Sequence, residues 1–515
     1  MRNAREAKDL VCVHHSLMIP LRGLSDVRAA GDLIWFQHAL DRLRALRREA
    51  DPRLEAFFSA DSPVYIARAP GRLDVMGGIA DYSGARVLEL PLACSTAAVL
   101  QAQDMPRCDI ATRRGGRWHF FSVELPSLVE RDGSLGTPAS LAAWFAGRDA
   151  DRWASYVVGI VQYCLARAAR EGRSVPAGLR LLIDSTVPEG RGVASSAALE
   201  VAAGAVVVAS CGSPMTAAEL AAACQAVENQ VVGAPCGIMD QMTSACGQRD
   251  RLLRLRCQPG TIEGYVDIPD GYRFYGIDSG ISHAVAGADY GTVRTAAFMG
   301  YRMIAAAAAL PVVRDGTRVR VEDPRWGGYL ANLTVPEFSG LSSALPEEMF
   351  GAEFLERYDG LTDTATQVRP ERRYPVRAAT EHPVREHERV ERFAGLLGAL
   401  AEQSHAALEL GRLMYESHKS YGACGLGSEG TDRLVALVAA EGPEHGLFGA
   451  KITGGGSGGT VAILGTSGAE ALVRDVAARY GAETGREAGV FTESGPGAAE
   501  TGVLLLEADA LASDR

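Results

Sequence analysis

Apolar residues recur along the chain with two different periods, and the first segment with a clear period is helical. Between residues 31 and 48, Leu33, Phe36, Leu40 and Leu43 follow one another at intervals of three or four residues. This spacing places the four side chains on one face of a helix, because an α-helix turns once in about 3.6 residues. The sequence therefore predicts an amphipathic helix near the start of the chain.

Short β-type runs separated by turns follow this helix. Residues 64–100 contain two strand-like runs on either side of a glycine-rich turn. Apolar runs of strand length recur further along the chain, with helical segments between them. The other expected strands are Leu179–Ser185, Arg273–Asp278, 447–452 and 460–465, and the other expected helices are 197–211, 217–232, 391–414 and about 468–480.

The order of these segments predicts the fold class and the domains. A chain of 515 residues has room for roughly two to four domains. Strands and helices do not alternate as regular βαβ units, so we expect an α+β fold whose two domains meet around residues 260–285. The expected parts are an N-terminal segment (1–61), a first domain (62–265) and a second domain (266–515), which contains a partly helical insertion or long surface excursion at about 311–385.

Charge argues against nucleic acid and membranes as partners. The formal net charge is −11 and no block of basic residues is present, which is unfavourable for binding an anionic polymer or surface. Only three of the 52 basic residues are lysines (Lys8, Lys419 and Lys451), and none follows a glycine. A Walker-type loop needs its lysine after glycine and is therefore excluded. Any phosphate chemistry must use backbone amides, arginine or a metal ion.

Cysteine usage and hydropathy indicate a protein of the cytoplasm. The ten cysteines form no C-x-x-C pair and most lie among small apolar residues, which favours free, buried thiols. There is no H-E-x-x-H motif, so a zinc site is not expected. Residues 1–30 carry charges within every short apolar stretch, and the longest small-apolar run, Ala197–Cys211, is too short to cross a bilayer. We expect no signal peptide and no membrane span.

Three glycine-centred motifs carry the candidate chemistry, and the first runs from Ala69 to Gly84 (APGRLDVMGGIADYSG). Taken alone, this pattern is explained about equally well by two strands joined by a glycine-rich turn and by a functional site. Arg72 and Asp81 favour a site, because charges set inside apolar sequence are costly to bury without partners.

The second motif, Val187–Glu200 (VPEGRGVASSAALE), places glycines and small hydroxylated residues between a strand and an Ala-rich helix. Phosphate binding at a helix N-terminus needs this arrangement, because unpaired amides and the helix dipole then face the anion. The serines have two interpretations. They either cap the helix, which is the commoner role for such a motif alone, or bind a magnesium ion that bridges phosphates.

The third motif, Lys451–Thr460 (KITGGGSGGT), has five glycines in six positions and so offers a concave set of amides. A dinucleotide-binding fingerprint is the rival interpretation. It is disfavoured because the loop runs into the apolar, strand-like TVAILG rather than into a helix.

A fourth segment, Glu228–Gln241 (ENQVVGAPCGIMDQ), supplies two carboxylates. Glu228 ends an expected helix, and Asp240 lies in an apolar stretch. Asp240 is either a helix cap or a group that accepts a proton or stabilises charge in a reaction.

In this order and with these neighbours, the motifs resemble the GHMP kinases, and among them the sugar-kinase branch that includes the galactokinases. The segments DSGISHAVAGADYGTVR (278–294) and LMYESHKSYGACGLGSEGTDRLV (413–435) support the resemblance, which runs from about residue 62 to the end. It implies a two-domain fold with an N-terminal, ATP-binding domain and an active site in the cleft between the domains. It also implies ATP and Mg²⁺ as cofactors and a small sugar as the other substrate.

The resemblance implies roles for individual residues. Asp240 matches the catalytic aspartate, and Arg72 matches the arginine that orients the nucleophile and favours the ionised aspartate. Ser196 and Glu228 match the magnesium-holding pair. The implied sugar contacts are Asp81, Gly237 and Tyr290, and the implied ATP-binding residues are Gly190, Arg191, Gly192, Val193, Ala194, Ser195 and Ser196, with Trp153 and Tyr156 beside the adenine. Lys451 receives no role.

One departure from the family bears on the acceptor. Galactokinases read Gly-Glu-His-Thr-Asp-Tyr where this chain has Gly77-Gly78-Ile79-Ala80-Asp81-Tyr82, so Gly78 and Ile79 replace a Glu-His pair that lies toward the C6 hydroxyl. L-Arabinopyranose has the galactose ring configuration without that hydroxymethyl group. A Glu and a His left without partners would cost about 1–3 kcal/mol each. The departure therefore favours a pentose over a hexose.

The resulting hypothesis is ATP-dependent phosphorylation of the C1 hydroxyl of L-arabinose, giving β-L-arabinose 1-phosphate. Three alternatives stay open: a galactokinase with relaxed specificity, a catalytically silent sensor of sugar and ATP, and a kinase for another acceptor such as a sugar acid. Ser195-Ser196-Ala197 and Asp240 are both present, which disfavours the silent sensor. We expect a monomer.

Overall fold

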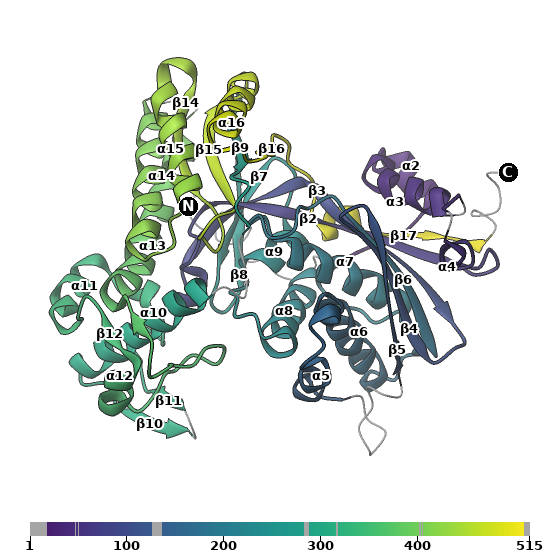
Figure 1. The fold of residues 1–515 in the computed structure, drawn as a ribbon, viewed down its shortest axis with the longest axis horizontal. Helices are drawn as coiled ribbons and strands as arrows, with labels where there is room; N and C mark the ends of the chain where they lie inside the picture. Colours follow the sequence, from purple (N-terminus) through teal and green to yellow (C-terminus); the bar gives the residue numbers. More distant parts are fainter. Residues whose placement is uncertain are drawn as a thin grey trace, which may run out of the picture.

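The computed structural model describes residues 18–508 apart from residues 47, 50, 126–135, 283–287, 316–317, 401–402 and 404. In this part of the chain the largest element is a nine-stranded sheet in the order β1-β17-β2-β3-β6-β4-β5, with β7 pairing with β3 and β8 with β7 (Figure 1). The strands are β1 (Leu21–Gly23), β2 (Val64–Met76), β3 (Arg86–Gln103), β4 (Arg107–Arg114), β5 (Arg117–Glu124), β6 (Gly178–Ser185), β7 (Arg251–Arg256), β8 (Thr261–Asp267) and β17 (Val503–Leu506).

Alternate residues of β2 face two different helical layers. Val64 and Ile66 pack with the N-terminal helices, whereas Ala67 and Ala69 pack in a cluster on the opposite face. This follows from the two-residue period of a strand. The first layer comprises α2 (Leu24–Ala30), α3 (Leu33–Leu46) and α4 (Pro52–Glu55), and the second comprises α5 (Pro138–Phe145), α6 (Arg152–Arg170), α7 (Ser195–Ser210), α8 (Ala217–Val227) and α9 (Met239–Cys246). The predicted amphipathic helix is thus confirmed as α3.

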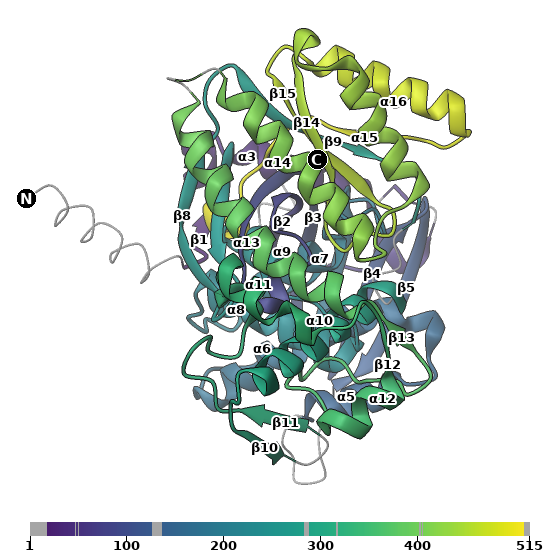
Figure 2. The same cartoon turned by 90° about the vertical axis from the view of Figure 1, so that its left-hand side faces the viewer.

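A second sheet has four antiparallel strands in the order β14-β15-β9-β16. Figure 2 shows β14, β15 and β9 of this sheet. On β15, Leu464 faces α13 and α14, and Ile463 faces α15 and α16. The strands are β9 (Tyr272–Asp278), β14 (Leu447–Ile452), β15 (Thr460–Thr466) and β16 (Val490–Phe491), and the helices are α13 (Val376–Ala399), α14 (Ala406–Ala423), α15 (Glu429–Glu441) and α16 (Glu470–Thr484). The third glycine motif, which follows β14, therefore leads into a strand, as predicted.

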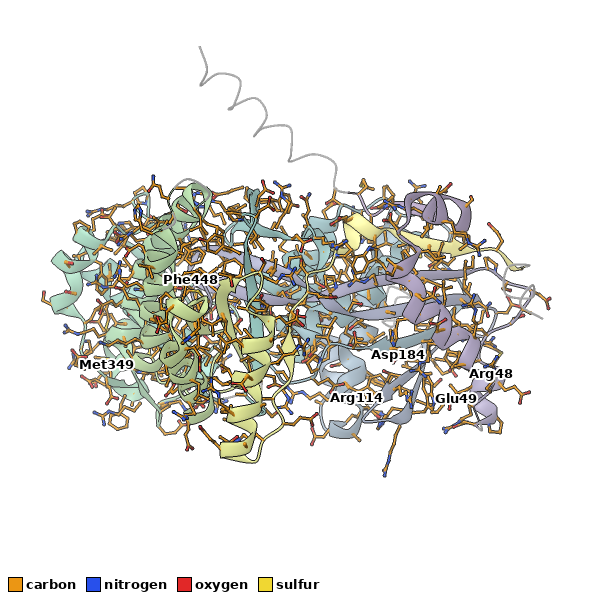
Figure 3. All side chains as sticks on the ribbon, turned by 90° about the horizontal axis from the view of Figure 1, so that it is seen from above. Arg48, Glu49, Arg114, Asp184, Met349 and Phe448 are labelled. Atoms are coloured by element: carbon orange, nitrogen blue, oxygen red, sulfur yellow. The ribbon has the colours of Figure 1, made fainter. Side chains whose placement is uncertain are left out.

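The described residues of 311–385 pack into a core that they share with neighbouring parts of the chain. Trp326, Phe338 and Phe354 are buried there against α10 (Ala288–Ala307) and the start of α13. This core lies at one end of the molecule with Met349, and Arg48 and Glu49 lie at the other end (Figure 3). The elements of the segment are β10 (Val312–Asp315), β11 (Arg318–Val321), α11 (Val335–Leu341), β12 (Met349–Phe350), α12 (Gly351–Tyr358) and β13 (Arg373–Tyr374).

The end of the described chain returns to the first sheet. Strand β17 pairs antiparallel with β2 and parallel with β1. The sequence did not predict that the end of the chain pairs with the first sheet, because an apolar run of four residues does not indicate which distant strand it pairs with. The division into parts at residues 61 and 265 stays a prediction.

Two predicted helices differ from the observed ones. The helix expected at 217–232 ends at Val227 and continues as a wider π-helical turn, Glu228–Val232. The helix expected at 391–414 is two helices, since α13 ends at Ala399 and α14 begins at Ala406. Residues 401–402 and 404, which fall in that expected helix, lie outside the described residues.

The expectations about free cysteines and membrane spans can be compared with the structure. The nine cysteines that the structure describes are free. None of the described helices combines the length and the apolar composition needed to cross a membrane. Cys12 and most of the stretch used to judge a signal peptide lie among residues 1–17, outside the described part, as do residues 283–287 of the segment 278–294.

Candidate active site

The motifs from both halves of the chain meet at one pocket of about 610 Å³, part of it open to solvent. Eleven of the predicted site residues line it together with four others. The predicted residues are Arg72, Asp81, Gly190, Gly192, Ala194, Ser195, Ser196, Glu228, Gly237, Asp240 and Tyr290, and the others are Pro235, Cys236, Met239 and Gly455.

The loop before α7 has the backbone geometry of an anion site. Gly190 and Gly192 have positive φ angles of 68° and 70°, and Ala194 adopts the same left-handed region with φ 59° although it has a side chain. A residue with a side chain keeps this strained backbone conformation only where the surrounding structure fixes it, and such residues cluster at functional sites. In the described structure no side chain caps the N-terminus of α7, so its first amides can face an anion in the pocket.

The capping interpretation of the two serines is therefore wrong. The N-cap of α7 is Ala194, and the Ser196 hydroxyl donates to Glu228 Oε1 at 3.0 Å instead. Burial and the nearby Asp240 charge raise the pKa of Glu228 to about 7, against the opposing effect of the Ser196 hydrogen bond. Glu228 and Ser196 offer hard oxygen atoms side by side, which suits Mg²⁺ held by one or two protein ligands and by phosphates. The donor set therefore fits the metal ion.

The third glycine motif packs against the loop before α7, residues 190–194, which we call the phosphate loop. A Cβ at Gly454 would come within 2.9 Å of the Gly192 carbonyl oxygen, and one at Gly459 within 2.9 Å of the Arg191 carbonyl oxygen. The Thr460 hydroxyl donates to that Arg191 carbonyl at 2.8 Å. Glycine is needed in this motif because two loop backbones approach closely.

Arg72 and Asp240 form the central pair of the pocket. Arg72 is 2% exposed, and its Nε and Nη2 lie 2.9 and 2.7 Å from Asp240 Oδ1. Its Nη1 donates to the Gly192 carbonyl at 2.6 Å, so the same guanidinium contacts the phosphate loop and the carboxylate. Burial alone would lower the pKa of Arg72, but the carboxylates of Asp240 and Glu89 raise it, and the group stays charged.

Asp81, Gly237 and Tyr290 also line the pocket, and we call this wall its acceptor side. A Cβ at Gly237 would lie 1.7 Å from Asp81 Oδ2, so the carboxylate needs glycine there. Burial and the Asp240 charge raise the pKa of Asp81 to about 6. The Tyr290 ring packs edge-on against Tyr82, with 5.8 Å between the ring centroids. This wall combines a carboxylate with an aromatic face.

Six predicted residues lie outside the described lining of this pocket. A side chain at Gly78 would point away from it, since its Cβ would come 1.9 Å from Tyr421 Oη and 2.2 Å from Asp74 Oδ2. Ile79 is buried in the core that includes Val293 and Phe298. The other four are Arg191, Val193, Trp153 and Tyr156.

These four have contacts that explain their position. Arg191 Nε lies 3.4 Å from Asp278 Oδ2, so its side chain pairs with the second sheet. Val193 is buried in the core, and its carbonyl accepts from the Arg72 amide at 3.1 Å. Trp153 packs edge-on against Phe121. Burial, together with the nearby carboxylates of Glu228 and Glu200, raises the pKa of Tyr156.

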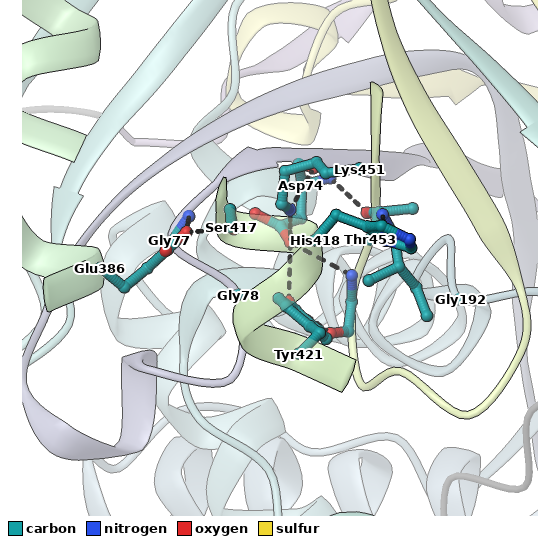
Figure 4. Close-up of polar contacts among 12 residues, drawn as sticks. Asp74, Gly77, Gly78, Gly192, Glu386, Ser417, His418, Tyr421, Lys451 and Thr453 are labelled. Atoms are coloured by element: carbon teal, nitrogen blue, oxygen red, sulfur yellow. Dashed lines mark hydrogen bonds and ion pairs between the residues drawn. The ribbon is translucent and has the colours of Figure 1, made fainter. Parts of the chain in front are cut away.

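A buried ion pair beneath the pocket was missed by sequence reasoning. Lys451 Nζ lies 2.8 Å from Asp74 Oδ2, and both side chains are fully buried. The same carboxylate oxygen accepts from the Gly454 amide and from Tyr421 Oη, each at 3.2 Å, so it joins β2, the third glycine motif and α14 (Figure 4). Only the unusual single lysine in the glycine motif hinted at this role.

Glu89 was missed as well, although the signal that marked Arg72 also applies to it. It is a charged residue within the apolar strand sequence VLELPL, fully buried, with Oε2 3.3 Å from Arg72 Nε. Burial and the neighbouring Asp74 charge raise the pKa of Glu89 well above its usual value. Arg72 is therefore held between two carboxyl groups.

A glycine loop at a helix N-terminus, a buried arginine–aspartate pair and an adjacent pair of magnesium-type ligands define a phosphoryl-transfer site without a Walker lysine. The sequence profile described as "GHMP kinases N terminal domain" matches residues 155–248, and the one described as "GHMP kinases C terminal" matches residues 396–482. The chain belongs to the GHMP kinase family.

Individual relatives agree with this assignment. The chain is 38% identical to an L-arabinokinase of Arabidopsis thaliana, over 87% of this chain and 47% of the plant protein, so it spans about half the length of that relative. It is 31% identical to a galactokinase of Chloroflexus aggregans, over 82% of this chain and 90% of the relative. The crystal structure of Lactococcus lactis galactokinase complexed with galactose superposes with a TM-score of 0.63 at 19% identity, over 84% and 94% of the two chains, which shows a shared fold.

Proposed function

We propose that the protein is an ATP-dependent sugar kinase that phosphorylates the C1 hydroxyl of L-arabinose and releases β-L-arabinose 1-phosphate and ADP. The observation that carries the proposal is the contact of one guanidinium, that of Arg72, with both Asp240 and the phosphate loop at Gly192. This contact brings a proton acceptor and an anion site to the two sides of one buried positive charge. The similarity to an L-arabinokinase supports the choice of substrate.

In the proposed reaction the C1 oxygen attacks the γ-phosphorus of ATP, and the bond from that phosphorus to the bridging oxygen of ADP breaks. Asp240 accepts the proton of the C1 hydroxyl, or assists its loss electrostatically. Arg72 orients the carboxylate and stabilises negative charge that develops between the two reactants. The amides at the start of α7 bind the phosphates. Mg²⁺, when bound by Ser196 and Glu228, would neutralise part of the phosphate charge.

The acceptor side favours a small, uncharged ring. Asp81 offers a carboxylate to sugar hydroxyls, and Tyr290 offers an aromatic face. Gly78 and Ile79, which replace the Glu-His pair, lie outside the described lining of the pocket. We therefore propose that they influence the choice of sugar through the position of Asp81, two residues after Ile79. Restoring Glu-His at these positions is a poor test, because a side chain at 78 would collide with Tyr421 and Asp74.

A galactokinase with relaxed specificity is the second candidate, and the similarity to a galactokinase over 90% of its length favours it. A panel of sugars with ADP release as the readout tests both candidates. We expect kcat/KM to be larger for L-arabinose than for D-galactose. A larger value for D-galactose would favour the second candidate. If neither sugar leads to ADP release, both candidates are contradicted, and a kinase for another acceptor or a silent sensor takes their place. We propose that the protein acts in the cytoplasm, where ATP is available as the phosphoryl donor. We also expect a monomer, which sedimentation of the full chain would check.

A further inference from the structure

Residues 311–385 take no part in the proposed reaction, yet one of their carboxylates is buried beside the pocket. Asp363 is 4% exposed and Arg294 of α10 is 7% exposed. The two form a bidentate pair, with Arg294 Nε donating to Oδ2 at 2.9 Å and Nη2 donating to Oδ1 at 2.8 Å. The Thr366 hydroxyl also donates to Oδ2 at 2.6 Å. The carboxylate is therefore fully engaged and holds the guanidinium in one orientation.

The remaining nitrogen of Arg294 reaches the pocket wall. Nη1 donates to the carbonyl oxygen of Cys236 at 3.0 Å. Cys236 lines the pocket between Pro235 and Gly237, in the segment that joins Glu228 to Asp240. One planar group thus connects the 311–385 segment to the loop that separates the proposed metal ligand from the proposed catalytic aspartate.

The position of Arg294 relates this connection to the acceptor rather than to the nucleotide. Tyr290 lies one helical turn before it on α10 and lines the pocket. The Asp81 carboxylate packs directly against Gly237, the residue after Cys236. The charge of Arg294 opposes the rise in the pKa of Asp81 and so acts on the same carboxylate. A shift of the loop would move Asp81 and Gly237 together.

The loop also has contacts that do not depend on Arg294. The Cys236 amide donates to Asn229 Oδ1 at 2.9 Å, and Asn229 Nδ2 donates to the Cys236 carbonyl at 3.3 Å. Both bonds lie within the segment Glu228–Gln241. Removing Arg294 leaves these bonds in place, so the loop keeps its own contacts and loses the one from α10. Arg294→Gln alone also leaves the buried Asp363 carboxylate without its charged partner, so the free energy of unfolding of each variant is measured beside the kinetics.

From these contacts we infer that Arg294 and Asp363 are positioning residues for the acceptor side of the pocket, and that residues 311–385 influence the choice of sugar through them. The inference rests on the proposed function for its kinetic readout. Arginine is suited to this role because its rigid fork fixes two partners at once, which lysine cannot do.

The test compares the full-length wild-type protein with Arg294→Lys, Arg294→Gln and Asp363→Asn. We expect KM for L-arabinose to rise about tenfold in each variant, because small misplacement of a bound reactant is costly, while KM for ATP stays within about twofold. Arg294→Lys should not rescue the defect. The double variant Arg294→Gln/Asp363→Asn should be little worse than either single variant, because the two residues act as one unit.

Arg302→Gln is the matched control. Arg302 lies two turns further along α10, is 8% exposed, and packs over Tyr358 in the core of the segment. This variant should leave KM for L-arabinose within about twofold of wild type. The inference is overturned if the Arg302 and Arg294 variants raise KM for the sugar equally, or if KM for ATP rises as much as KM for the sugar.

Amide hydrogen exchange of the peptide around residues 230–240 gives a readout without substrate. Faster exchange there in Asp363→Asn, with unchanged exchange elsewhere, supports the inference, and unchanged exchange contradicts it. If the wild-type protein phosphorylates no sugar, the proposed function fails, and the exchange measurement still decides whether the pair positions the loop.

Discussion

The two sides of the pocket are built in different ways. The nucleotide side is a contiguous stretch, residues 190–196, whose backbone conformation and helix terminus form the site. The acceptor side collects Asp81, Gly237 and Tyr290 from three separate segments, and Arg294 and Asp363 lie behind them. Arg72 is the group that contacts both sides. Phosphate recognition is therefore local, whereas sugar recognition depends on how distant segments pack.

The two sides also differ in charge. The nucleotide side presents amides and the positive end of a helix dipole, which attract phosphates. The acceptor side presents the carboxyl group of Asp81, whose pKa is raised by burial. Substitutions on one side should leave binding on the other side almost unchanged, and the following predictions test this separation.

The largest effect is expected for Asp240→Asn. The substitution keeps the shape of the side chain but removes the proton acceptor, so kcat should fall by at least about 1,000-fold. The dissociation constant for ATP, measured by titration calorimetry, should change less than about twofold. Turnover close to wild type would show that Asp240 is not the catalytic aspartate.

A large loss of stability is expected for Lys451→Met, because the buried Asp74 carboxylate would lose its charged partner. The free energy of unfolding in urea should fall by about 3–5 kcal/mol. Lys419→Met is the matched control, since Lys419 is an exposed lysine on α14, and its effect should stay within about 0.5 kcal/mol. Equal effects of the two variants would refute the structural role of the pair.

Ser196→Ala should weaken the nucleotide side alone. Loss of the hydroxyl removes a proposed metal ligand and its bond to Glu228, and KM for MgATP should rise about tenfold. KM for the sugar should not change, and steady-state kinetics with each substrate varied in turn would check this. A parallel rise in both constants would break the separation of the two sides.

The smallest effect is a pH dependence of sugar affinity. With a pKa of about 6, Asp81 is mostly ionised at pH 7.5 and mostly protonated at pH 5.5, so sugar affinity should fall about fourfold over that range. Because the folded-state pKa lies above the unfolded value, this group favours the folded state at low pH, and that contribution is lost as the pH rises through about 6. Asp81→Asn should remove the step, and its persistence in that variant would assign it to another group.

The sequence predicted the local parts of the molecule well. Hydrophobic periods located α3, β6 and β9, and the second glycine motif located the phosphate loop, because these features depend on neighbouring residues. The helix boundary at Val227 was missed because the apolar residues Val231 and Val232 of the π-helical turn extend the apolar pattern of the helix.

The acceptor side was harder to predict because its parts are joined only by packing. Arg294 and Asp363 are 69 residues apart in the chain. Arg294 ends the segment 278–294 that supports the resemblance but received no role from it, and Asp363 stands in no recognisable motif. Gly78 was placed in the sugar site by resemblance, although a side chain there would face Asp74 and Tyr421. Glu89 could have been predicted as a site residue, because it is a charged residue in an apolar strand sequence, which is the signal that identified Arg72.

The most direct test of the central claim is the position of the phosphate in the product. L-Arabinose labelled with ¹³C at C1 would be incubated with the full-length protein, ATP and Mg²⁺, and the product examined by NMR. The account predicts that the C1 resonance becomes split by coupling to phosphorus and that D-galactose reacts with a lower kcat/KM. Phosphorus coupling at another carbon, or an unchanged C1 resonance while ATP is hydrolysed, would contradict the account.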